Sequence, residues 1–221
     1  MNPRAFTLRA TLLLGTCLAG PAMAEGVLAQ LYAPRPPAGS AFVRVVNPSA
    51  ESHKVQISNG TVQAIGPSQL ASSYAIVKGN EAFSVTLDGK PAGQLQVAPD
   101  SFNTLVPQDG KLQVLDDSAG SEDALKAELR FYNLASDCPK GSLAVADGGP
   151  ALFADVAPLS TAARAINPVS ASLSAGCGKA TAEKLALPQL KPGDHYSLFL
   201  TGSAAAPVLR GQLSSTDLYA K

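Results

Sequence analysis

Short apolar stretches alternate with turn signals along almost the whole chain, and apolar residues rarely recur at helical spacing. Asn59-Gly60, Asp88-Gly89 and Asp109-Gly110 lie between such stretches, and these dipeptides accept the positive φ angles of tight hairpins. The pattern predicts short strands at the spacing of a sandwich or barrel. The predicted strands are residues 42–46, 54–58, 82–87, 93–97, 103–106, 111–115, 127–133, 142–146, 151–156, 162–166, 169–174, 181–187, 196–201 and 208–213.

A polar segment, DDSAGSEDALK at residues 116–126, separates two sets of strands and has the composition of a linker. The two sets resemble each other, because VRVVN at 43–47 corresponds to LRFYN at 129–133 and both sets end on a strand, a turn and a last strand. The sequence therefore predicts an all-β chain of two tandem small β-sandwich-like domains. Their expected bounds are 25–117 and 127–221, joined by a short polar linker at 118–126.

The first 24 residues have the pattern of a secretory signal peptide. Arg4 and Arg9 precede an apolar run at 11–20, and Ala22-Met23-Ala24 forms a small-x-small cleavage site. Cleavage near Ala24 would deliver the protein to the periplasm. A retained membrane anchor is the alternative, although the run is short for ~30 Å of hydrocarbon. Lipidation at Cys17 is a second alternative.

The charge and cysteine content narrow the classes of partner. The chain has 17 basic and 17 acidic residues without a clustered positive stretch, which argues against nucleic acid and anionic membranes as partners. Cys138 and Cys177 remain after signal cleavage, and an even pair in an exported protein predicts a disulfide. Closing a loop of about forty residues would stabilise the fold by roughly 4 kcal/mol. A redox pair or metal site is the alternative, without a Cys-x-x-Cys motif to support it.

Two arginines, Arg44 and Arg130, stand in the middle of predicted strands. Side chains alternate between the faces of a strand, so both arginines are expected to point away from the core of their domain. One interpretation makes them solvated residues whose methylenes cover apolar surface. The other makes them members of exposed aromatic-basic pairs, Phe42 with Arg44 and Arg130 with Tyr132, of the kind enriched at protein interfaces.

No catalytic, metal or cofactor motif accompanies the ionisable residues. His53 and His195 are the histidines of the chain, and neither lies near a Gly-x-Ser-x-Gly motif. A triad of His195 with Asp194 and a distant serine has no support beyond residue type. The acidic pairs Asp116-Asp117 and Glu122-Asp123 are interpreted as solvated linker residues because no EF-hand loop or histidine set surrounds them. The sequence thus predicts a protein that is not an enzyme and needs no metal or cofactor.

The stretch LYAPRPPAGSAFVRVVN at 31–47 resembles the start of the mature region in the AlgF family, the periplasmic accessory proteins of alginate O-acetylation. The matching residues are Leu31-Tyr32, Pro36-Pro37, the run 39–45 and Asn47, with weaker agreement at 167–169 and 200–203. The resemblance implies an exported, non-catalytic, two-domain β protein. It also implies partners, namely a membrane-bound O-acyltransferase and periplasmic polysaccharide O-acetyltransferases.

The leading hypothesis is therefore a periplasmic adaptor required for O-acetylation of an exopolysaccharide, alginate in the first instance. The proline-rich segment at 32–42 could form a rigid, polyproline-like surface that a partner protein binds. The alternatives are a carbohydrate-binding module that holds the polymer itself, an enzyme that carries acetyl groups, and the equivalent accessory role in cellulose acetylation. The chain has no tryptophan, and therefore few aromatic side chains that could stack on sugar rings, which argues against a carbohydrate-binding module. The predicted partner-binding residues are Tyr32, Pro36, Pro37, Phe42, Arg44, Arg130 and Tyr132.

Overall fold

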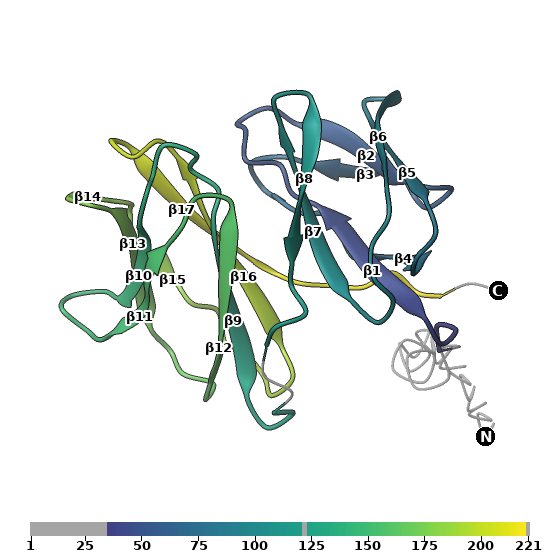
Figure 1. The fold of residues 1–221 in the computed structure, drawn as a ribbon. Helices are drawn as coiled ribbons and strands as arrows, with labels where there is room; N and C mark the ends of the chain where they lie inside the picture. Colours follow the sequence, from purple (N-terminus) through teal and green to yellow (C-terminus); the bar gives the residue numbers. More distant parts are fainter. Residues whose placement is uncertain (1–34, 121–122, 220–221) are drawn as a thin grey trace, which may run out of the picture. The chain divides into compact units, whose positions relative to one another are not determined.

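The computed structural model describes residues 35–120 and 123–219, so the predicted signal peptide and Tyr32 lie outside the described residues. The described chain is all-β, and its strands β1 to β17 form four sheets (Figure 1). This confirms the predicted fold class of two β-sandwich-like halves. Within these residues no helix is long and apolar enough to cross a membrane.

The first half consists of two four-stranded sheets. One has the order β4-β1-β7-β8, and the other has the order β3-β2-β5-β6. The central pair β1–β7 is parallel, whereas the other pairs in these sheets are antiparallel. Val43, Val45, Val85 and Leu105 are fully buried between the sheets. The strand bounds are β1 Ser40–Val45, β2 His53–Ile57, β3 Gln63–Ile65, β4 Ala75–Lys78, β5 Phe83–Leu87, β6 Lys90–Leu95, β7 Phe102–Gln108 and β8 Lys111–Asp116.

The second half repeats this topology. Its sheet β12-β9-β16-β17 has the parallel pair β9–β16 at its centre, and its other sheet has the order β11-β10-β13-β14 with β15 also paired to β13. The matched sequences at 43–47 and 129–133 therefore belong to equivalent strands, β1 and β9. The bounds are β9 Ala127–Asn133, β10 Gly141–Val145, β11 Ala151–Val156, β12 Ser160–Ile166, β13 Ser172–Cys177, β14 Ala180–Thr181, β15 Leu185–Ala186, β16 His195–Gly202 and β17 Pro207–Leu213.

The strand predictions differ from the structure at short elements and at turns. The pattern missed β3 and β4, which have only three and four residues. It gave one strand at 181–187 where the chain forms β14 and β15. Strand β6 begins at Lys90, earlier than predicted, because Asp88 and Gly89 turn the chain with φ angles of 51° and 74°.

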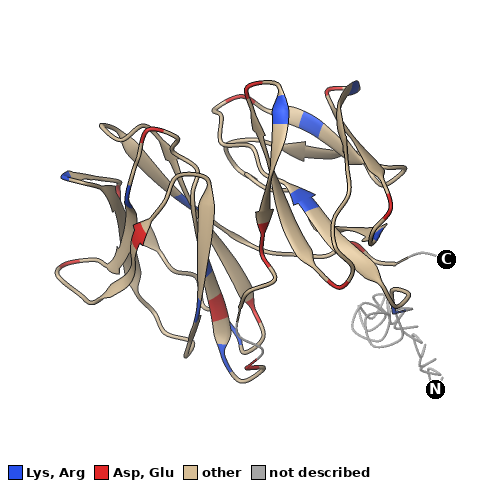
Figure 2. Cartoon of the chain, in the orientation of Figure 1, with Lys and Arg blue, Asp and Glu red and all other residues tan. Residues whose placement is uncertain are grey.

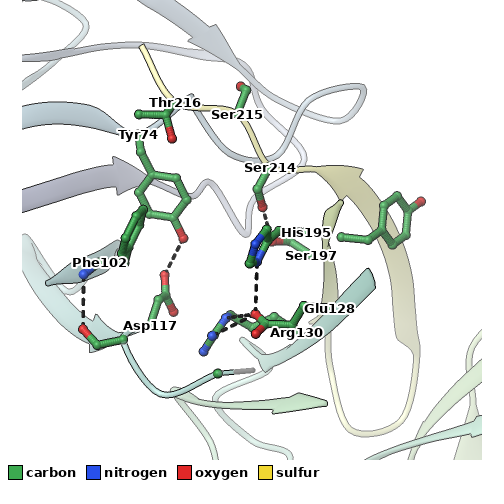
Figure 3. A pocket seen from close by; sticks show the side chains of 13 residues that line it. Tyr74, Phe102, Asp117, Glu128, Arg130, His195, Ser197, Ser214, Ser215 and Thr216 are labelled. Carbon is green, nitrogen blue, oxygen red and sulfur yellow. Dashed lines mark hydrogen bonds and ion pairs between the residues drawn. The ribbon is translucent and has the colours of Figure 1, made fainter. Parts of the chain in front are cut away.

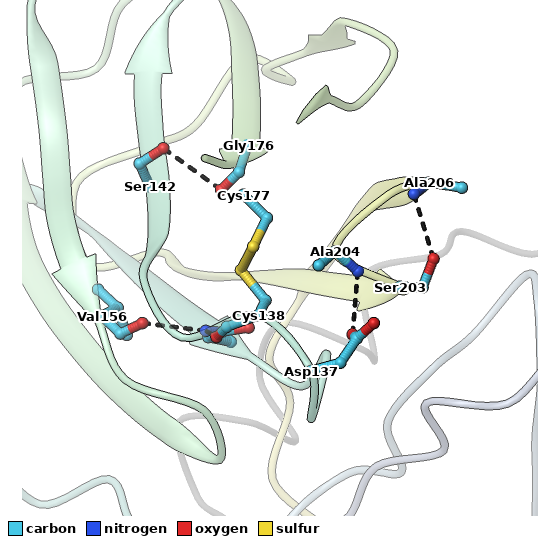
Figure 4. Close-up of a disulfide and its surroundings, with 10 residues drawn as sticks. Asp137, Cys138, Ser142, Val156, Gly176, Cys177, Ser203, Ala204 and Ala206 are labelled. Carbon is cyan, nitrogen blue, oxygen red and sulfur yellow. Dashed lines mark hydrogen bonds between the residues drawn. A yellow bond between two sulfur atoms is a disulfide. The ribbon is translucent and has the colours of Figure 1, made fainter. Parts of the chain in front are cut away.

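The predicted disulfide is confirmed. Cys138 and Cys177 are bonded, with their Cα atoms 5.7 Å apart, and the bond ties the turn after β9 to the end of β13 (Figure 4). Asn133, the last residue of β9, donates hydrogen bonds from Nδ2 to the carbonyl oxygens of Cys138 and Val156, both at 2.9 Å. The amide and the disulfide together fix the chain as it leaves the central strand.

The prediction that Arg44 and Arg130 point into solvent is wrong. Arg44 is 0% exposed and Arg130 is 7% exposed. The face assignment by alternation is correct, but the outer face of β4-β1-β7-β8 lies against the outer face of β12-β9-β16-β17, a contact that we call the seam. The apolar part of the seam is a third core formed by Val46, Leu70, Ala71, Val106, Leu115, Tyr132, Leu134 and Phe199.

Candidate functional site

The centre of the seam is the guanidinium group of Arg44, which projects from β1. It donates from Nε to Thr104 Oγ1 at 2.9 Å, from Nη1 to Ser214 Oγ at 3.1 Å, and from Nη2 to Tyr132 Oη at 2.6 Å and Ser197 Oγ at 2.9 Å. The acceptors come from β7, β9, β16 and the segment after β17. One buried cation therefore joins hydroxyl groups of both halves.

Aromatic rings and one carboxylate complete the surroundings of this cation. The guanidinium carbon of Arg44 lies 4.5 Å from the ring centroid of Tyr74, within the range of a cation–π contact. The Tyr74 hydroxyl donates to Asp117 Oδ2 at 2.7 Å, and the Thr104 hydroxyl donates to the same oxygen. Asp117 is 5% exposed, which corrects the expectation of a solvated linker residue. Its negative charge is connected to Arg44 through the Thr104 hydroxyl.

The ionisation of these groups follows from their burial. Burial alone would lower the pKa of Arg44, but the fields of Tyr132, Tyr74 and Asp117 raise that pKa above its ordinary value, so Arg44 remains charged. Burial raises the pKa of Tyr74, with opposition from Arg44 and reinforcement from Asp117. Burial also raises the pKa of Tyr132. The tyrosines therefore stay neutral and can donate and accept hydrogen bonds.

A second charged group lies on β9 at the edge of the seam. Arg130 Nη2 donates to Glu128 Oε1 at 2.9 Å and to the carbonyl oxygen of Ala119 at 2.7 Å. Glu128 is also buried, and His195 Nδ1 lies 3.5 Å from its Oε1. This ion pair holds the connection between β8 and β9 against the second half.

The Arg130–Glu128 pair lines a pocket of about 390 Å³, which we call the seam pocket (Figure 3). Its lining residues come from the first half, the connection, the second half and the segment after β17. Phe102 at its wall is 37% exposed. The principal lining side chains are Tyr74, Phe102, Asp117, Arg130, His195 and Thr216.

The groups of a hydrolytic triad are not assembled among the residues that the structure describes. His195 faces Glu128, and Asp194 Oδ2 accepts from the backbone N–H of Lys191 at 2.7 Å as a turn residue does. Ser197 and Ser214 lie 3.0 Å apart and both bind Arg44 instead of a general base. The described part of the chain also has no group of three side chains suited to hold a metal ion.

The predicted partner-binding residues have very different surroundings, and their role stays a prediction. Pro37 is exposed and Pro36 is half-buried. Phe42 is half-buried and stacks on Phe102 with a centroid distance of 4.4 Å. Arg44, Arg130 and Tyr132 are buried at the seam.

Sequence reasoning missed Tyr74, Asp117, Ser197 and Ser214. Tyr74 and Ser214 lie outside regular strands, where alternation gives no face assignment. Asp117 was hidden in an acidic linker pattern. The sequence did contain one signal of burial at the seam. The strand faces that were expected to meet solvent carry large apolar residues, Val46 in the first half and Phe199 in the second.

Comparison with known proteins shows one consistent relationship. The family model described as "Alginate O-acetyl transferase AlgF" matches residues 13–196. The alginate biosynthesis protein AlgF of Pseudomonas aeruginosa is 31% identical over 180 residues, with 80% of this chain and 81% of that protein covered. The protein of the same name from Pseudomonas putida is 28% identical over 196 residues, with 89% of each covered.

Two solved structures of separate AlgF domains from P. aeruginosa also match. The C-terminal domain is 31% identical with a TM-score of 0.36, and it covers 40% of this chain and 98% of that domain. The N-terminal domain is 26% identical with a TM-score of 0.29, and it covers 37% of this chain and 98% of that domain. The family match spans most of the sequence, and the chain therefore belongs to the AlgF family of alginate biosynthesis proteins.

Proposed function

We propose that this protein is a non-catalytic periplasmic adaptor required for the O-acetylation of alginate. It holds polysaccharide O-acetyltransferases, including a membrane-bound O-acyltransferase, near one another. Membership of the AlgF family supports the link to alginate acetylation. The Cys138–Cys177 disulfide supports an oxidising compartment, since thiols of cytosolic proteins are kept reduced.

The observation that carries the proposal is that the buried charged group Arg44 forms hydrogen bonds across the seam. Arg44 of the first half binds Tyr132, Ser197 and Ser214 of the second half. Ser197 and Ser214, which could otherwise be considered as nucleophiles, therefore help to join the two halves. A body joined in this way can present separate surfaces to separate partners, which is what an adaptor requires.

The proposal is tested with the purified mature protein in two assays. Incubation with a chromogenic acetyl ester should give hydrolysis no faster than buffer and no acetyl adduct by intact mass spectrometry. A pull-down should recover the acetyltransferases encoded in the same gene cluster. A stable adduct on one serine would establish an acetyl carrier instead, and binding of polymannuronate without recovery of any acetyltransferase would establish a carbohydrate-binding module.

A further inference from the structure

We propose that the seam pocket is the docking site for an arginine side chain of a partner protein. The proposal rests on the adaptor function above and identifies the seam pocket as the place where a partner of the adaptor binds. The pocket has three features that a guanidinium group requires, namely an unsatisfied carboxylate oxygen, an exposed aromatic face and surrounding hydroxyl groups. All three come from described residues.

The carboxylate is that of Asp117. Its Oδ2 accepts from Tyr74 and Thr104, whereas its Oδ1 is buried and has no hydrogen-bond partner within residues 35–120 and 123–219. Figure 3 shows the carboxylate at the wall of the pocket, facing the side formed by Arg130 and His195. A buried acceptor without a donor destabilises the folded protein. A donor supplied from the pocket side would remove this cost, with a small movement to reach the oxygen.

The aromatic face is that of Phe102. One side of its ring is stacked on Phe42, the ring of Tyr74 lies nearly perpendicular to it with the two centroids 5.3 Å apart, and the residue is 37% exposed. The protein already uses the same combination internally, because Arg44 lies against Tyr74 and is bound by hydroxyl groups. The seam pocket has the components of this combination again, because Phe102 and the hydroxyl-bearing residues Ser118, Ser215 and Thr216 are among those that line it.

The local charges allow a cation to enter. The positive charge of Arg130 is matched by Glu128 at 2.9 Å, and that of Arg44 is matched by Asp117 through the Thr104 hydroxyl. Asp116, the exposed residue that precedes Asp117 in the chain, does not line the pocket but adds a further negative charge to this segment. Over the whole molecule, basic and acidic residues are spread along both halves (Figure 2). A guanidinium group is favoured over an ammonium group because it is planar, stacks on aromatic rings and donates in a fork.

The first test uses N-acetyl-arginine methylamide as a probe and its uncharged isostere, N-acetyl-citrulline methylamide, as the control. Backbone amide NMR signals of the full mature protein are followed during titration. We expect saturable shifts at Phe102, Ser118 and Thr216 with the arginine probe, and at least fivefold weaker binding of the citrulline probe. Equal shifts with both probes, or none at these residues, would overturn the assignment to arginine.

The second test uses variants of the pocket to ask whether the partner protein binds there. Thr216→Trp fills the pocket from its exposed rim, and Phe102→Ala removes the aromatic face, whereas Val169→Ala changes an exposed apolar residue that does not line the pocket. We expect the first two to weaken capture of the acetyltransferases at least tenfold, with the thermal transition retained, and the third to leave capture unchanged. Undiminished capture by Thr216→Trp refutes the docking site while leaving the adaptor function intact. Failure of every variant and of the wild type to capture a partner refutes the adaptor function itself.

Discussion

Replacing Arg44 with methionine removes the guanidinium group from the seam and keeps most of the aliphatic stem. The change leaves Tyr132 Oη without the donor that lies 2.6 Å away in the native protein. Thr104 still reaches Asp117, and Ser197 and Ser214 still reach each other. The side chain that suffers most is Asp117, because its charge loses the nearby cation.

The size of the effect can be worked out from these losses. An unsatisfied buried acceptor costs about 1–3 kcal/mol, and a buried charge left without its partner costs about 3–5 kcal/mol. The connection between Arg44 and Asp117 passes through the Thr104 hydroxyl, so we take the lower part of the second range. The expected total is about 4 kcal/mol of unfolding free energy. For a protein of this size that corresponds to a fall of ~8–16 °C in the melting temperature.

The assay is a double-mutant cycle measured by urea unfolding with circular dichroism. Arg44→Met and Asp117→Asn are each expected to destabilise the protein. The double variant should be about 1–3 kcal/mol more stable than the sum of the two losses predicts, because the second change removes the charge that the first leaves unpaired. Asp123→Asn, at an exposed residue of the same connection, serves as the charge-matched control.

The reasoning would be refuted by either of two results. The first is an Arg44→Met protein within about 1 kcal/mol of wild type, since surface-like substitutions have effects below that size. The second is strict additivity in the cycle, which would mean that Asp117 does not sense the Arg44 charge.

Three further predictions concern stability. Replacing Cys138 and Cys177 together by serine should cost roughly 4 kcal/mol in urea unfolding, and an unchanged midpoint would contradict the loop-closure estimate. Gly79→Ala should lower the melting temperature, because a Cβ there would lie 2.4 Å from the Cα of Pro99 and overpacking costs about 1–3 kcal/mol; a fully retained melting temperature would contradict this. Burial raises the pKa of three tyrosines above the unfolded value near ~10, so their stabilisation is complete below that pH and is lost as the pH rises further. Tyrosinate absorbance should then appear together with unfolding, and ionisation in the folded protein would contradict it. The three are Tyr74, Tyr132 and Tyr196.

Strands with strong local signals were predictable from the sequence, and weakly marked ones were not. The bounds of β9 and β11 were predicted to the residue, since each is a clear apolar stretch between turn residues. Strands β3 and β4 are too short to show a period, and their pairing with β2 and β1 decides their conformation. The disulfide was predictable because only two cysteines, Cys138 and Cys177, follow the predicted signal peptide.

The site was harder to predict because burial at the seam is a tertiary property. Alternation gave the correct face for Arg44 and Arg130, but it cannot state what lies opposite that face. Strands buried on both sides carry apolar residues on both, as Val46 and Val106 do in the first half. Asp117 belongs to an acidic run whose neighbours are solvated, and only hydrogen bonds from Tyr74 and Thr104 distinguish it.

The parallel pairing at the centre of each half has a consequence for the time order of folding. Strand β1 needs β7, with Arg44 and Thr104 separated by 60 residues, and β9 needs β16. The segment beside β4 needs the last described residues, because Ser73 binds Asp217, 144 positions later. Contacts this distant in sequence form slowly. A chain that emerges from its N-terminus therefore lacks β7, the parallel partner of β1, until residue 108 has emerged, and it lacks β16, the parallel partner of β9, until residue 202 has emerged. Until β16 has emerged, that edge of β9 stays open to association with other chains.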